Sequence, residues 1–187
     1  ITAGGHPVVS GIQRGVGIQV DNDIQMAFSM TGGSVSDFQK NATVFNNADL
    51  TVTGVTITGG GAQTIIAQNG IQVLNSTGTI SGNIITGIGY AGPQVVYSGA
   101  VLAYGNTNLD ITGNTIEGAN SESTDAKVVG VFVLDFGSPN NGGMITGNTI
   151  SHVDEAIDVS GEFVTAGITV GVNLVSSIDL TDQYAAG

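Results

Sequence analysis

The sequence predicts an all-β fold in which the chain winds as a right-handed parallel β-helix (solenoid) of about six coils. Three observations predict this fold. A six-residue element recurs along the chain, a short strand that begins with a small residue recurs in step with it, and apolar and polar residues alternate within each unit. Repeats of about 20 to 50 residues are typical of solenoids, and alternation with a period of two residues is typical of strands.

The six-residue element reads Ile-Thr-Gly-Asn-Thr-Ile in its clearest copies, residues 111–116 and 145–150, and a close variant occupies residues 80–85. Weaker copies lie at residues 30–35 and 52–57. The apolar residues that end these copies are expected to stack as one interior column: Val35, Ile57, Ile85, Ile116, Ile150 and, in the last coil, Leu174.

A tight corner is expected inside each copy of this element. Gly113 and Asn114 stand where the chain must change direction, because Gly and Asn tolerate a positive φ. Asn83, Asn114 and Asn148 recur at one position of the repeat. Their amides are therefore expected to stack and to hydrogen-bond along the rod.

The strands that begin with a small residue are expected to start at Gly17, Asn41, Gly70, Gly99, Gly130 and Ala156. Together the two repeats place the β-helix at residues 17–175. An irregular amino-terminal segment or partial cap at 1–16 precedes it, and a carboxyl-terminal tail at 176–187 follows. Solenoids normally carry capping elements, and neither end segment has the pattern of a robust cap. An end is therefore expected to be covered by flanking domains or by a second copy packed end to end. The alternative is that residues 1–15 fold over the first coil.

The repeat resembles that of the pectate-lyase-like superfamily over roughly residues 17–175. The resemblance implies the fold, but this fold carries lyases, hydrolases, epimerases, phage tailspikes and inert scaffolds. A pectate lyase of the superfamily would use an Arg or Lys base and acidic calcium ligands around a central strand. The basic residues here are Arg14, Lys40 and Lys127, and none is expected to project from a central strand. The sequence therefore weighs against an enzyme without deciding the question.

His152 is the other candidate for catalysis. It precedes Asp154 and Glu155, and a histidine beside carboxylates could act as a general base. No nucleophile lies at a suitable spacing, which favours a role as a turn residue.

Charge and hydropathy exclude several classes of partner. The chain has 15 acidic and 3 basic residues, for a formal net charge of −12, and nucleic-acid binding depends on Lys and Arg. No apolar run is long enough to span a membrane. The acidic, Lys-poor composition, rich in Gly, Asn and Thr, favours an extracellular or cell-surface protein.

Insertions in a solenoid often collect on one binding face. Residues 86–98 and 117–129 follow the six-residue element in neighbouring coils and are expected to lie side by side, whereas residues 135–143 belong to a different edge. Four side chains of the first two insertions resemble a sugar-binding subsite, with Lys127 beside them: Tyr90, Tyr97, Glu122 and Asp125. The alternative is that Tyr97 and its neighbours merely cover an edge of the rod.

Two acidic clusters suggest calcium, the one cofactor for which the sequence gives any sign. Asp21 and Asp23 flank Asn22 just after a strand, and oxygen-rich turns of this kind can bind Ca²⁺. Asp154, Glu155 and Asp158 form the second cluster. A solvated surface is the alternative for both clusters.

Two columns of hydroxyl side chains are expected along the outside of the rod. One column comprises Thr31, Thr53, Ser81, Thr112 and Thr146, and the other comprises Ser34, Thr56, Ile84, Thr115 and Thr149. Regular Thr columns could match an ice or crystalline polysaccharide lattice. Against this, Thr is an ordinary residue of exposed strands, and the corner between the columns places them on different faces.

These observations predict a non-catalytic extracellular β-helix module. It would serve as a structural scaffold, an adhesive or a carbohydrate-binding unit, with carbohydrate or another copy of the chain as its partner. The alternatives are a fragment of a carbohydrate-active enzyme, similar to a polysaccharide lyase or epimerase, and, less favoured, an ice- or lattice-binding protein.

Overall fold

The computed structural model describes residues 15–119, 127–135, 138–161 and 167–178. The strands are β1 (Val16–Thr31), β2 (Ser34–Ser36), β3 (Asn41–Thr53), β4 (Thr56–Thr58), β5 (Asn69–Leu74), β6 (Thr77–Ser81), β7 (Ile84–Ile88), β8 (Tyr97–Tyr104), β9 (Leu109–Thr112), β10 (Thr115–Gly118), β11 (Lys127–Asp135), β12 (Met144–Thr146), β13 (Thr149–Ser151), β14 (Glu155–Gly161), β15 (Thr169–Val170) and β16 (Leu174–Ser176). The described residues contain no helix, so the all-β prediction is confirmed. In particular, this part of the chain has no helix of the length and hydropathy needed to cross a membrane.

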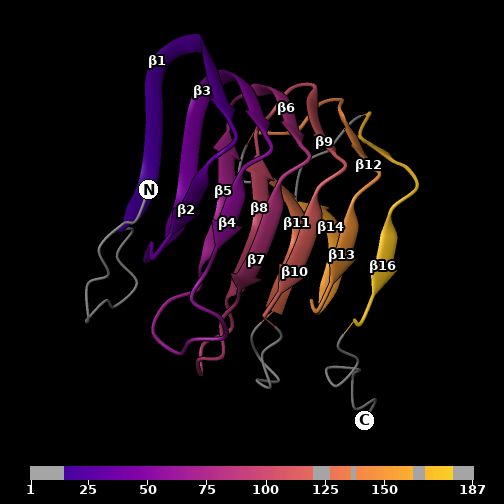
Figure 1. The fold of residues 1–187 in the computed structure, drawn as a ribbon. Helices are drawn as coiled ribbons and strands as arrows, with labels where there is room; N and C mark the ends of the chain where they lie inside the picture. The colour runs from indigo at the N-terminus through magenta and orange to yellow at the C-terminus, as the bar shows by residue number, and fades with distance from the viewer. Residues whose placement is uncertain (1–14, 120–126, 136–137, 162–166, 179–187) are drawn as a thin grey trace.

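The strands stack in parallel as a β-solenoid with three faces (Figure 1). The first face consists of β5, β8, β11 and β14, and the second consists of β6, β9, β12 and β15. Both are extended by β1 and β3, whose two halves bend from one face onto the other and join the two faces into one ten-stranded sheet. The third face is the six-stranded sheet of β2, β4, β7, β10, β13 and β16.

The chain makes about five turns, which place six strands on the third face and so agree closely with the expected six coils. Each turn brings residues about 30 positions apart into direct pairing; Ile85, for example, pairs with Ile57 on one side and Ile116 on the other. The right-handed winding stays a prediction.

The interior column of the third face is confirmed over five coils. Val35, Ile57, Ile85, Ile116 and Ile150 pair in register and are fully buried. In the last coil the prediction was wrong by one residue. Val175 pairs with Ile150, whereas Leu174 pairs with Thr149 and is 66% exposed. Since side chains alternate between the two sides of a strand, a shift of one residue moves Leu174 to the outside.

A column of small residues lies where the first face begins. It alternates between two residue types along the rod: Gly17, Ala42, Gly70, Ala100, Gly130 and Ala156. A Cβ atom on Gly70 would lie 2.4 Å from the carbonyl oxygen of Ala100 and 3.0 Å from Cγ2 of Ile85. The small side chains therefore let the corner pack against the interior column.

Two of the predicted strand starts are consequently one residue out of register. Asn41 pairs with Asn69, and Gly99 pairs with Val129, so Ala42 and Ala100 occupy the positions that had been assigned to Asn41 and Gly99. The sequence has two small or polar residues in succession at both places, and composition alone does not say which of them faces the core.

The predicted asparagine ladder is confirmed and extends by one residue. The side-chain Nδ2 of Asn83 donates to Oδ1 of Asn114, Asn114 donates to Asn148, and Asn148 donates to Asn173, each over 2.9 Å. Gly113 has a φ of +63°, as expected, but Asn114 does not share a positive φ. The Gly makes the turn, and the Asn beside it satisfies the backbone groups that the turn leaves unpaired.

A second ladder joins the first and second faces and was not predicted. The backbone N–H of Ser76 donates to Oδ1 of Asn106 over 2.9 Å, and that of Asn106 donates to Oδ1 of Asn140 over 3.0 Å. These residues lie in segments of different length, which hides their equivalence in the sequence.

Insertions gather at the corner between the third and first faces, at the lower edge of the rod in Figure 1. Residues 89–96 connect these faces in one coil. Of the insertion expected in the next coil, residues 120–126 lie outside the described residues, and the backbone N–H of Ala119 donates to the carbonyl oxygen of Ile88 over 2.9 Å. Residues 59–68 form a third insertion at this corner that the sequence analysis did not single out. Residues 138–143 precede β12 at a different corner, as expected, and residues 136–137 lie outside the described residues.

Candidate functional site

A cleft of about 560 Å³ lies on the outside of the first face. Its floor is built from two columns of outward-facing residues. The first column comprises Gln72, Leu102, Phe132 and Asp158, and the second comprises Tyr104, Leu134 and Ser160. Neighbouring strands are about 4.8 Å apart, so successive coils present one residue of each column at this interval along the rod.

The insertion at residues 89–96 and the start of β8 wall the cleft. Val95, Val96 and Tyr97 line it from this side. The ring of Tyr97 packs on that of Phe132, with centroids 5.4 Å apart and an interplanar angle of 37°. Tyr97 remains 39% exposed, so part of its ring is open to a ligand in the cleft.

Polar groups are placed at defined points of this largely apolar cleft. Gln72 Nε2 donates to the hydroxyl of Tyr104 over 2.8 Å. Burial raises the pKa of the Tyr104 phenol, although the hydrogen bond from Gln72 acts in the opposite direction. The phenol is therefore neutral at physiological pH.

Lys40 lies at the end of the cleft, just before β3. Its Nζ donates to the carbonyl oxygen of Ala67 over 2.5 Å, and burial lowers the pKa of the ammonium. Among the Lys and Arg side chains, Lys40 is the one that the structure describes, because Arg14 and the side chain of Lys127 lie outside the described part of the chain. It faces the cleft from the end opposite to Asp158.

The predicted sugar subsite is described only in part. Tyr97 lines the cleft, and the strand pairing places Lys127 beside it. Tyr90 is 3% exposed and packs with Ala67 and Val96, so its ring faces are covered by the protein. Glu122 and Asp125 lie outside the described residues.

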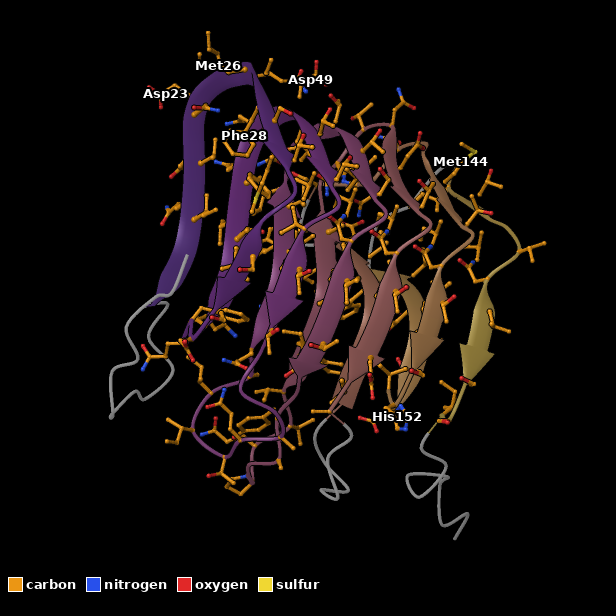
Figure 2. All side chains as sticks on the ribbon, in the orientation of Figure 1. Asp23, Met26, Phe28, Asp49, Met144 and His152 are labelled. Carbon is orange, nitrogen blue, oxygen red and sulfur yellow. The ribbon has the colours of Figure 1, made fainter. Side chains whose placement is uncertain are left out.

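The acidic residues proposed for calcium are placed as follows. Asp21 and Asp23 lie in the bend of β1, where Asp23 projects from the end of the rod near Met26 (Figure 2). Oδ1 of Asp21 accepts a hydrogen bond from Asn46 Nδ2 over 2.8 Å. Oδ2 of Asp154 accepts one from the backbone N–H of Val128 over 2.5 Å. Within the described ranges, no group of three or more His, Cys, Asp or Glu residues lies close enough together to hold a metal ion.

His152 occupies the corner after β13, at the end of the strands opposite to Met26 (Figure 2). Its φ is +52°, and its Nδ1 lies 3.7 Å from Oε1 of Glu117, with both side chains more than half exposed. This geometry fits a turn residue.

The two hydroxyl columns are confirmed in register and lie on different faces. Thr53 pairs with Thr31 and Ser81 on the second face, and Thr115 pairs with Ile84 and Thr149 on the third. The hydroxyl oxygens of Thr53 and Ser81 are 3.1 Å apart. The column on the third face is interrupted by Ile84, and Asp110 and Met144 interrupt the neighbouring column on the second face.

Most residues of the cleft were not predicted from the sequence. Gln72, Tyr104 and Phe132 lie on repeated strands that the analysis located, and their alternation with buried residues could have shown that they face outward. What the sequence did not supply was the register between coils, which brings them together. No protein-family model, curated protein or solved structure matches this chain.

Proposed function

We propose that this chain is a non-catalytic carbohydrate-binding β-helix module and that neutral glycans bind in the cleft on the first face. The observation that carries the proposal is the combination, in one cleft of about 560 Å³, of exposed aromatic surface at Tyr97 with amide, hydroxyl and carboxylate groups at Gln72, Tyr104 and Asp158. Sugar rings have apolar faces that pack on aromatic rings and hydroxyls around their edges that hydrogen-bond to such groups. Few polar groups in a mostly apolar cleft are typical of ligand sites.

Charge supports a neutral ligand. The chain carries a formal net charge of −12, which repels polyanions, and Asp158 lies in the cleft itself. A neutral chain lying along the rod would meet an equivalent set of strands about every 4.8 Å. The extended geometry of the cleft thus supports binding to several consecutive sugar units.

The experiment is a screen of immobilised neutral and acidic glycans, followed by isothermal titration calorimetry with the best neutral ligand. Tyr97→Ala removes the exposed ring and is expected to weaken binding about tenfold to thirtyfold, which corresponds to about 1.4 to 2 kcal/mol. Thr115→Ala, on the third face, is the matched control and should leave the affinity unchanged. Binding of no glycan, or equal affinity of both variants, would refute the proposal.

The enzyme alternative has its own test. The purified chain is not expected to cleave or epimerise pectate or alginate, with or without calcium, because the sequence provides no recognisable acid–base pair. Activity that is lost on changing His152 or Lys127 would promote the enzyme interpretation. The same proposal includes membership of the pectate-lyase-like superfamily, an extracellular location and right-handed winding. The right-handed winding is supported by the general preference of parallel crossovers for this hand.

A further inference from the structure

A second, smaller cavity of about 180 Å³ adjoins the cleft. The two share Lys40, Val96 and Tyr97 in their walls, so they meet at these residues. The smaller cavity, called the side pocket below, lies between the insertions at residues 59–68 and 89–96. Ala91 N–H donates to the carbonyl oxygen of Gln63 over 2.8 Å and ties these two insertions together.

The walls of the side pocket combine apolar and polar side chains. The exposed Ile65 and the partly buried Val96 supply accessible apolar surface, and the buried Ile66, Ala67 and Tyr90 complete the apolar lining. Gln94 and the ammonium of Lys40 supply the polar groups. The hydrogen bond from Lys40 Nζ to the carbonyl of Ala67 holds the ammonium against this pocket.

Lys40 has further N–H groups that can donate to a ligand. An ammonium carries three N–H groups, and the bond to Ala67 uses one of them. A group that entered the side pocket would therefore meet both N–H donors and apolar surface. The side-chain amide of Gln94 can both donate and accept.

Resting on the proposed function, we propose that the side pocket receives the acetamido group of an N-acetylated sugar whose ring lies in the cleft. The methyl group would pack on Ile65 and Val96, the carbonyl oxygen would accept from Lys40 Nζ, and the amide N–H would reach Gln94. This substituent carries an apolar group beside hydrogen-bonding groups, and the walls of the side pocket offer both kinds of surface.

A sugar carboxylate is the competing ligand for Lys40. Two features favour the acetamido group over it. The apolar part of the pocket wall, at Ile65, Ile66 and Val96, offers contact surface to a methyl group, and a carboxylate has no apolar group to place there. The net charge of −12 opposes the approach of an anion.

The test compares three probes by calorimetry on the full chain: tetra-N-acetylchitotetraose, cellotetraose and a galacturonate tetramer. The first two share length and linkage and differ at the acetamido position. The acetylated probe is expected to bind at least about tenfold more tightly than cellotetraose, as expected for one well-placed group. The galacturonate tetramer should bind most weakly.

Two variants test whether the side pocket causes the preference for the acetylated probe over cellotetraose. Lys40→Met and Gln94→Ala are each expected to reduce the ratio of the two affinities severalfold, and Gln94 is an exposed loop residue whose replacement leaves the core intact. Thr115→Ala should leave the ratio unchanged. Equal affinity for the first two probes, tighter binding of galacturonate, or a ratio unaffected by both variants would overturn the inference while leaving neutral-glycan binding in place. Failure of every neutral glycan in the broader screen would instead remove the proposed function, and the inference with it.

Discussion

At the scale of single residues, the corner between the third and first faces depends on side chains that are absent or minimal. Gly70 and Gly99 lie about one coil apart at this corner and both are buried, yet their surroundings differ. A Cβ on Gly70 would lie 2.4 Å from the carbonyl oxygen of Ala100, whereas a Cβ on Gly99 would have its nearest neighbours at 3.4 Å. Both glycines have φ values outside the left-handed region, so the comparison concerns space alone.

Gly70→Ala is therefore expected to destabilise the chain by about 1 to 3 kcal/mol through overpacking. Gly99→Ala is the matched control and should change the free energy of unfolding by less than about 0.5 kcal/mol. Urea denaturation followed by circular dichroism measures both. Equal destabilisation by the two variants would mean that the register between coils is not as described.

Lys40 gives a prediction about pH. Burial lowers its pKa below the ordinary value of 10.5, so between the folded and unfolded pKa values the unfolded chain binds more protons than the folded chain. The contribution of Lys40 to stability is therefore least favourable at low pH and improves as pH rises through the folded pKa. Lys40→Met removes this dependence. The stability of the natural chain relative to that variant is expected to rise as the pH approaches 10.5 from below, measured by urea denaturation at each pH. If the free energies of unfolding of the two chains differed by the same amount at every pH, Lys40 would be as well solvated in the folded chain as in the unfolded one.

The residues of the proposed binding site differ in how readily the sequence identifies them. Tyr97 was singled out because it stands in an insertion, and insertions are visible in a repeat. Lys40, Gln72 and Tyr104 stand inside or beside regular strands, where each looks like an ordinary surface residue. They become a site only because the coil brings together residues about 30 positions apart, and a single-residue error of register such as that at Gly99 is enough to obscure this.

At the scale of elements, the third face is the part of the fold that the sequence predicts best. Each of its strands is short, ends a repeated six-residue element and places one aliphatic residue inside, so that the pattern alone aligns β4, β7, β10 and β13. The pattern fades at β16, where Leu174 and Val175 are both apolar and the choice between them was wrong. The first face has longer strands with variable starts, and its register follows from packing at the Gly and Ala column.

Ile116→Asp tests the interior column of the third face. Ile116 is fully buried between Ile85 and Ile150, and an unpaired carboxylate at this position is expected to destabilise the fold by several kcal/mol. Loss of the cooperative thermal transition in circular dichroism is the expected result. Thr115→Asp places the same charge on the exposed side of β10 and should fold normally. A folded Ile116→Asp variant with unchanged melting would contradict the column.

At the scale of the whole molecule, the carboxyl-terminal end of the rod differs from its middle. Val159, Val170 and Val175 continue the inward-facing positions of the preceding coil, but they are 40%, 50% and 43% exposed. Strand edges at the end of a sheet also present backbone groups that can pair with another chain. An apolar end surface of this kind favours association, whereas the net charge of −12 opposes it at low salt.

Light scattering over a concentration series is accordingly expected to show self-association that strengthens as salt screens the charge. Replacement of Val170 and Val175 by Ser should reduce it, and Thr115→Ser serves as the control on a side face. A strictly monomeric chain at high concentration and high salt would mean that the exposed valines do not mediate contact between copies.

The claim on which the functional account depends is that glycans bind on the outside of the first face. Chemical-shift mapping by NMR, with an assigned ¹⁵N-labelled chain titrated with the tightest neutral oligosaccharide from the screen, tests it most directly. The predicted result is that the largest shifts fall on Gln72, Leu102, Tyr104 and Leu134 and on Val96 and Tyr97 beside them, with Thr56, Thr115 and Thr149 unaffected. Shifts confined to the hydroxyl columns of the second and third faces would contradict the account and would place binding on those columns instead.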